Sequence, residues 1–104
     1  MALVDWSPLL DKIGGKVNFT TFSESFSCSE LYDIVLASLH VAEAHYIDVS
    51  WKGRYKCFKI TLFIDPLTID DLDNEIDIRY CTNAKDVYPL VEQVIESFIN
   101  RNVD

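Results

Sequence analysis

The sequence predicts a single α+β domain, in which a single layer of about four strands carries two amphipathic helices packed on one face. Apolar and polar residues alternate in four segments, and apolar residues recur every three or four positions in two others. Hydrophobic residues make up 49% of the 104 positions. A chain of this length can bury roughly 65% of its unfolded surface, so residues 1–104 are expected to form one domain. The predicted order is β-α-β-β-β-α after a short N-terminal helix.

The N-terminal part predicts a short helix followed by a strand. Ser7 is suited to cap the helix and Pro8 to occupy its first position. Gly14-Gly15 predicts the end of the helix, because glycine readily adopts the left-handed conformation that is common there. Residues 16–22 then alternate apolar and polar side chains, which predicts the first strand.

Residues 30–44 predict a core-facing helix that connects the first strand to the next. Ser27 and Glu30 fit a capping box, in which each side chain accepts a backbone N–H at the helix start. The apolar residues that follow return at helical spacing: Leu31, Ile34, Val35, Leu39 and Ala42.

Residues 46–64 predict a β-hairpin with its turn at Lys52-Gly53, where Gly53 can take a positive φ. The alternation changes phase in the second arm. One extra residue turns every later side chain to the other face of a sheet, so we expect a β-bulge near Cys57-Phe58.

The C-terminal part predicts a fourth strand and a second core helix. Residues 75–81 alternate, with Ile76, Ile78 and Tyr80 on one side and Glu75, Asp77 and Arg79 on the other, and the charged side is expected to face solvent. The helix is expected to begin at Asp86, because Pro89 then falls where its missing N–H costs nothing.

The last five predicted elements, α-β-β-β-α, resemble the topology of a double-stranded-RNA-binding domain. That module needs a basic surface for phosphates, whereas this chain has a net charge of -8 and a pI near 4.5. We therefore expect no nucleic-acid partner and no binding to anionic membranes. No apolar run approaches the roughly 18 residues of a spanning helix, and three cysteines without paired spacing favour a reducing, cytoplasmic location.

The sequence contains no recognisable catalytic or metal-binding motif. Three glycines provide no phosphate-binding loop, and His40 and His45 are five residues apart, which does not suit a helical metal pair. The acidic run fails as an EF-hand, since Ile76 stands where glycine is needed and Thr82 where glutamate is needed. We expect no enzyme, no cofactor and no metal, although a cysteine-dependent enzyme using Cys28, at a predicted helix start, is a less favoured alternative.

The charge pattern predicts a protein-binding role. Four of the nine basic residues cluster in the hairpin, and an uninterrupted acidic run follows. The main hypothesis is a small acidic inhibitor or immunity or anti-defence type protein that neutralises a basic partner protein, with the acids steering association and aromatic residues anchoring it. The alternative is an oligomerising accessory domain without catalytic activity, such as a homodimer in which the hairpin of one copy meets the acidic run of another. The predicted partner-binding residues are Asp70, Asp71, Asp73, Glu75, Asp77, Trp51, Tyr55 and Phe63.

Overall fold

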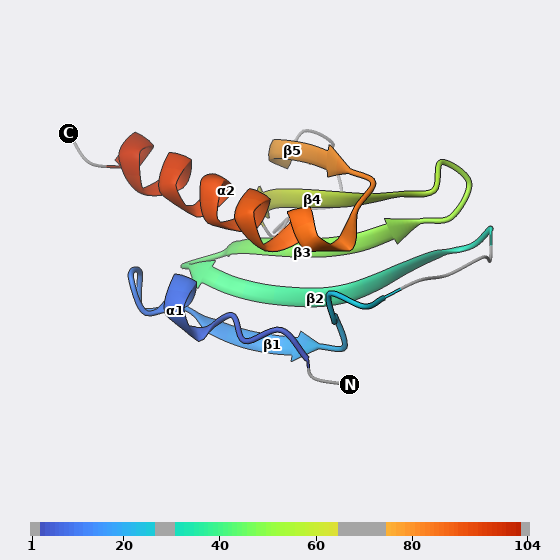
Figure 1. Ribbon diagram of the computed structural model, residues 1–104. Coiled ribbons are helices and arrows are strands. Elements are labelled where there is room, and N and C mark those ends of the chain that lie inside the picture. The colour runs from blue at the N-terminus through green and yellow to red at the C-terminus, as the bar shows by residue number, and fades with distance from the viewer. Residues whose placement is uncertain (1–2, 27–30, 65–74, 103–104) are drawn as a thin grey trace.

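The computed structural model describes residues 3–26, 31–64 and 75–102. It shows an α+β fold in which a five-stranded antiparallel sheet carries a long C-terminal helix and a short N-terminal helix on one face (Figure 1). The elements are α1 (Ser7–Leu10), β1 (Lys16–Thr20), β2 (Asp33–Ala42), β3 (His45–Lys52), β4 (Cys57–Ile64), β5 (Glu75–Cys81), the 3-10 turn η1 (Ala84–Asp86) and α2 (Val87–Asn102).

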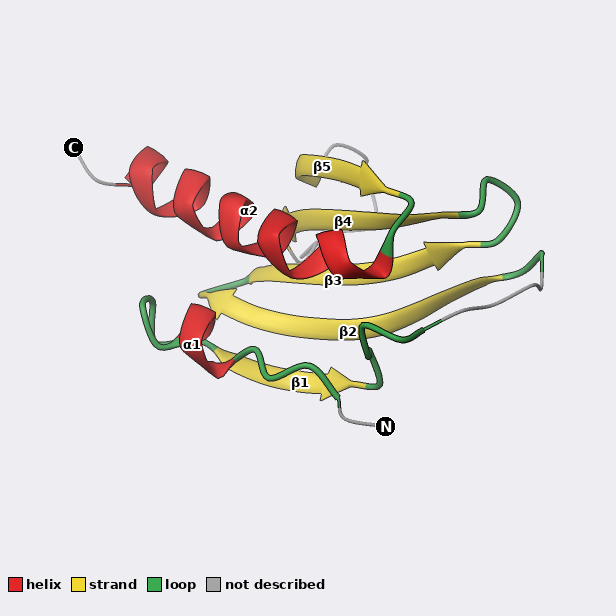
Figure 2. Cartoon of the chain, in the orientation of Figure 1, coloured by secondary structure: helices red, strands yellow, loops and turns green. Residues whose placement is uncertain are grey.

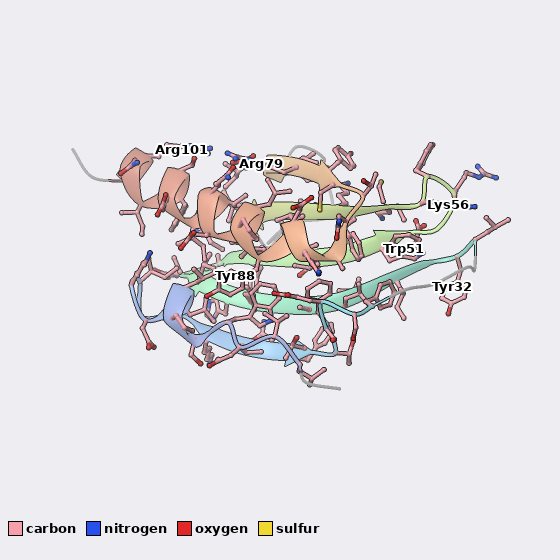
Figure 3. All side chains as sticks on the ribbon, viewed as in Figure 1. Tyr32, Trp51, Lys56, Arg79, Tyr88 and Arg101 are labelled. Atoms are coloured by element: carbon pink, nitrogen blue, oxygen red, sulfur yellow. The ribbon has the colours of Figure 1, made fainter. Side chains whose placement is uncertain are left out.

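The sheet is a meander, because its spatial order β1-β2-β3-β4-β5 is also the order along the chain. Figure 2 shows α2 lying across β3 and β4 and α1 lying beside β1, both on the same side of the sheet. A single core joins the two helices to that side. Trp6 links the parts of this core, since its ring stacks at 5.6 Å on Tyr88 of α2, which is labelled in Figure 3, and its Nε1 donates to Thr20 Oγ1 at 3.1 Å.

The predicted helix over residues 30–44 is wrong, because residues 33–42 form strand β2. Ala37, Leu39 and Val41 are buried and alternate with less buried neighbours, which is the period of a strand. The pairing with β3 shifts between Val35 and Ala37. This bulge brings apolar residues together along the sequence, and their spacing resembles that of a helix.

This correction changes the fold in two ways. The sheet has five strands instead of about four, and α2 is the one long helix among the described residues. The resemblance to the α-β-β-β-α topology is lost with it. The predicted capping residues, Ser27 and Glu30, lie outside the described residues.

The hairpin over residues 46–64 is confirmed, but the predicted bulge at Cys57-Phe58 is wrong. Pairing runs without a shift from His45 opposite Ile64 to Lys52 opposite Cys57. Residues 53–56 form the turn, so the change of phase in the sequence marks turn residues and not a strand irregularity. The left-handed residue of this turn is Lys56, with φ 51°, and not Gly53.

The ends of the helices agree with the sequence only in part. The predicted cap at Ser7 is wrong, because Ser7 is the first residue of α1 and its N-cap is Trp6, which makes no side-chain capping hydrogen bond. Gly14 takes the predicted left-handed conformation, with φ 68°. Gly15 is needed for a different reason, because a Cβ there would lie 2.6 Å from the carbonyl oxygen of His40. Asn83 caps η1 by accepting a hydrogen bond from the N–H of Lys85, and α2 follows at Val87. Among the described helices, none is long and apolar enough to cross a membrane.

Candidate functional site

The face of the sheet opposite the helices, called here the open face, is the most distinctive surface of the molecule. Cross-strand partners point to the same side of a sheet, so the strand registers assign its residues. These are Lys16, Phe19, Asp33, Val35, Ser38, His40, Tyr46, Asp48, Ser50, Lys52, Cys57, Lys59, Thr61, Phe63, Glu75, Ile78 and Tyr80, together with Ile76 at the bulge in β5.

The open face carries several exposed apolar side chains along the two edge strands. Phe19 on β1 is 46% exposed, and Ile78 and Tyr80 on β5 are 41% and 58% exposed. Aromatic rings also continue across the middle strands, where Tyr46 stacks on His40 at 4.7 Å and on Phe63 at 5.8 Å. Apolar groups grouped in this way on a surface are typical of binding sites.

A polar depression of about 260 Å³ lies between these apolar groups. Its floor includes the buried side chains of Ser50 and Thr61. The residues that line it are Asp48, Ser50, Lys52, Lys59, Thr61, Phe63 and Glu75.

Three of the four charged residues in the depression have ionic partners. Lys59 Nζ lies 3.3 Å from Glu75 Oε2, and Lys52 Nζ lies 3.4 Å from Asp33 Oδ2. Asp48 forms no ion pair with any residue that the structure describes. The depression therefore contains one acid whose charge is not balanced by a direct neighbour.

Asp48 is held in an unfavourable environment for a carboxylate. Burial raises its pKa above the ordinary 3.8, and a hydrogen bond with the Ser38 side chain only partly opposes this. Its Oδ1 is buried and has no hydrogen-bond partner among the described residues. A carboxylate in this condition would gain from a cation placed nearby.

The predicted acidic run does not form one continuous row. Asp70, Asp71 and Asp73 lie outside the described residues. Glu75 pairs with Phe63 on the open face, whereas Asp77 pairs with Leu62 on the helix-covered face. The expectation that these two acids share a face is wrong, because the β4–β5 pairing shifts between Leu62 and Phe63.

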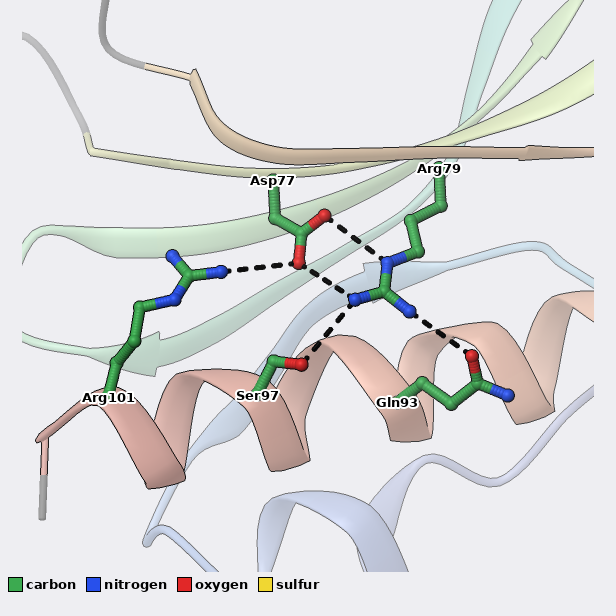
Figure 4. Close-up of polar contacts among 5 residues, drawn as sticks. All are labelled: Asp77, Arg79, Gln93, Ser97 and Arg101. Atoms are coloured by element: carbon green, nitrogen blue, oxygen red, sulfur yellow. Dashed lines mark hydrogen bonds and ion pairs between the residues drawn. The ribbon is translucent and has the colours of Figure 1, made fainter.

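Asp77 belongs to a polar network that joins β5 to α2 (Figure 4). Its two carboxylate oxygens each accept a hydrogen bond of 3.2 Å from Arg79, and Arg101 Nη2 lies 3.5 Å from Oδ2. Arg79 also donates to Gln93 Oε1 at 3.1 Å and to Ser97 Oγ at 3.4 Å. Asp77 and Arg79 therefore face α2, contrary to the expectation that the charged side of β5 is exposed to solvent.

The three predicted aromatic anchors occupy different environments. Trp51 is 7% exposed and packs edge to face against Phe26 and Phe58, so it is a core residue in the free protein. Tyr55 is 76% exposed in the hairpin turn. Phe63 lies on the open face at the rim of the depression. Sequence reasoning did not single out Asp48, although its place in an alternating strand puts it on the face away from the core.

The basic hairpin turn and the acidic run are attached to opposite ends of β4. Residues 53–56 precede Cys57, and residues 65–74 follow Ile64. From Cys57 to Ile64 the strand takes seven steps of about 3.3 Å, which separate these ends by roughly 23 Å. In Figure 3, Lys56 marks the turn at one end of the molecule and Arg101 lies toward the other.

The described cysteines do not suggest a nucleophile. Burial, together with the charge of Asp86, raises the pKa of Cys81 to about 11, so its thiol stays protonated at neutral pH. Cys28 lies outside the described residues. Within those residues, no group of three or more His, Cys, Asp or Glu side chains is placed to hold a metal ion. No family model, curated protein or solved structure matches the chain.

Proposed function

We propose that this protein is a small acidic protein-binding module that binds a basic partner protein, as an inhibitor or immunity or anti-defence type protein would. The observation that carries this proposal is the open face, where the carboxylate of Asp48, without an ionic partner among the described residues, lies in a polar depression that Phe63 also lines. Ile78 and Tyr80 are exposed on the neighbouring strand, opposite Thr61 and Lys59 of the depression. Such a surface suits a partner that inserts a lysine or arginine, because the cation would pair with Asp48 while apolar groups of the partner cover Phe63, Ile78 and Tyr80.

The distribution of charge along the chain supports a basic partner. All nine basic residues and 11 of the 17 acids fall in the described ranges. The other six acids add -6 without a compensating base, and four of them lie in residues 65–74, which connect Ile64 to Glu75 beside Phe63. This excess of negative charge in the chain would accelerate association with a cationic protein.

The proposal is tested by finding the partner and locating its contacts. The tagged protein is exposed to a lysate of its source organism at about 0.1 M and about 0.5 M salt, a range over which the Debye length falls roughly twofold. A basic protein held at low salt and released at high salt is then purified, and its dissociation constant is measured for the wild type, Phe63→Ala, Asp48→Asn and Tyr55→Ser.

We expect Phe63→Ala and Asp48→Asn each to weaken binding by about tenfold or more, the effect of losing a central contact. Asp48→Asn should also reduce the salt dependence of binding. Tyr55→Ser compares the open face with the hairpin turn, because Tyr55 is exposed at the turn and does not line the depression. Binding that is weakened by Tyr55→Ser alone would place the contact at the turn, where the sequence also predicted an anchor. A partner that binds Phe63→Ala and Asp48→Asn as tightly as the wild type would show that the open face is not the binding surface.

A further inference from the structure

Strand β5 ends the sheet on one side and β1 ends it on the other. Each has one neighbouring strand, and in the described parts of the chain no strand pairs with the outer side of either. The backbone N–H and C=O groups on the outer side of an edge strand are available to pair with a further strand. The two edge strands differ in whether their side chains favour pairing with a further strand.

The side chains of β5 are sorted by face. Ile76, Ile78 and Tyr80 are exposed on the open face. Asp77 and Arg79 lie on the helix-covered face, where each already contacts the other. An edge strand with exposed apolar residues on one face and opposite charges on the other can pair with a copy of itself.

We propose that two copies of this protein pair through their β5 strands, antiparallel and around a twofold axis at Ile78, to form one continuous sheet. In this register Ile78 faces its symmetry mate and Ile76 faces Tyr80 of the second copy. Aliphatic and aromatic residues opposite one another are favourable cross-strand pairs. On the other face, Asp77 of each copy lies opposite Arg79 of the other, so two oppositely charged pairs complete the contact.

The charges select this register over its neighbours. When two copies keep their open faces on the same side, the register can shift only in steps that preserve the alternation of side chains. One such step centres the contact on Asp77 and places two carboxylates opposite each other, and the other centres it on Arg79 and places two guanidinium groups opposite each other. Like charges directly opposite are destabilising, so the register centred on Ile78 is preferred.

The other edge is unsuited to the same contact. Strand β1 has five residues, and its pairing with β2 shifts between Val17 and Phe19. As a result Val17 lies opposite Leu39 on the helix-covered face, whereas Phe19 lies opposite Ser38 on the open face. Both edge strands carry a bulge, but β5 has seven residues and keeps Ile76, Ile78 and Tyr80 exposed on the open face, whereas β1 is shorter and divides its apolar residues between the two faces. A short edge of this kind resists strand addition. The twofold contact is therefore assigned to β5.

The test is sedimentation velocity over protein concentrations from about 1 µM to about 1 mM, where weak to moderate dimers are detected. The wild type should pass from monomer to dimer as concentration rises. Ile78→Lys places two ammonium groups at the twofold axis and should raise the dissociation constant at least tenfold. The matched control is Phe19→Lys, the same kind of change at a similarly exposed position on the other edge, which should dimerise like the wild type.

Circular dichroism and urea unfolding establish that each variant is folded, and Tyr80→Lys gives a second chance to break the contact if Ile78→Lys is unfolded. A wild type that stays monomeric throughout, or a dimer that survives both β5 variants, would overturn the proposal. Ile78 also lies on the open face, opposite Thr61 of the depression, so Ile78→Lys can weaken partner binding as well as the dimer. Phe63→Ala separates the two proposals: Phe63 is on β4 and not on the edge strand, so this variant should weaken partner binding and dimerise like the wild type.

Discussion

The two faces of the sheet are built from the same strands but have opposite properties. On the helix-covered face, β3 and β4 contribute the fully buried residues Ile47, Val49, Ile60 and Leu62. On the open face, the same strands contribute Asp48, Ser50 and Thr61, which are polar, and Phe63, which is only partly buried. The comparison shows that period-2 alternation separates residues that stabilise the fold from residues that are available for binding.

The largest expected difference between the two faces concerns two phenylalanines on β4. Phe58 is 2% exposed and contacts Phe22, Phe26 and Trp51 in the core. Phe58→Ala should lower the free energy of unfolding by about 3–5 kcal/mol, because it leaves a cavity. Phe63→Ala, on the open face, should lower it by about 1 kcal/mol. Urea unfolding followed by circular dichroism measures both, and equal losses would show that the open face is as tightly packed as the core.

A smaller effect is expected from the network between β5 and α2. The Asp77 side chain is 13% exposed, and its removal would leave Arg79 and Arg101 facing α2 without their carboxylate. Asp77→Ala should therefore lower the free energy of unfolding by about 1–3 kcal/mol. Glu92→Ala is the control, because its 3.9 Å contact with Lys12 is exposed and contributes at most about 0.5 kcal/mol. If both variants lose equally little, the network does not fix α2 to the sheet.

The smallest change in the free energy of unfolding is expected from Asp48→Asn. It is an increase, whereas the substitutions described above lower the free energy of unfolding. The folded-state pKa of Asp48 lies above the ordinary 3.8, so folding favours the protonated form and the wild type loses stability as pH rises through 3.8 to the folded pKa. Asp48→Asn avoids this loss. The variant should be more stable than the wild type at pH 7, with the gain disappearing below about pH 3.

Asp5 provides the contrast for Asp48. A hydrogen bond from the Ser7 backbone N–H lowers the pKa of Asp5, so its contribution to stability is present above pH 3.8 and is lost as pH falls through the folded pKa. Asp5→Asn should therefore be slightly less stable than the wild type at neutral pH. Urea unfolding at several pH values measures both variants. If the wild type and Asp48→Asn are equally stable at every pH tested, burial of the Asp48 carboxylate does not lower the free energy of unfolding.

The sequence predicted the elements whose periodicity is uninterrupted. The hairpin, β5 and α2 each keep one period over most of their length, and their positions agree with the structure. Two failures occur at bulges, and a third, the bulge expected at Cys57-Phe58, comes from the residues of the hairpin turn. The bulge at Leu36 made β2 resemble a helix, and the bulge at the start of β5 placed Glu75 and Asp77 on opposite faces. A bulge depends on the partner strand as well as on local sequence, so alternation alone does not locate it.

The candidate site was predicted only in part for the same reason. Phe63 and Glu75 do line the depression, whereas Trp51 and Asp77 point to the covered face. Asp48 can be recognised as a site residue only from the strand pairing, which brings Ser38 and Thr61 opposite it from the neighbouring strands. A single strand pattern shows that a residue points away from the core, but not which residues surround it.

The meander topology also affects how the chain is made. Every strand pairs with its neighbour in sequence, so the sheet can assemble hairpin by hairpin while synthesis proceeds. The helix that covers the core face, α2, is encoded after all five strands. During synthesis the nascent sheet therefore has an apolar surface on its core side before α2 is available, which is the kind of intermediate that chaperones recognise.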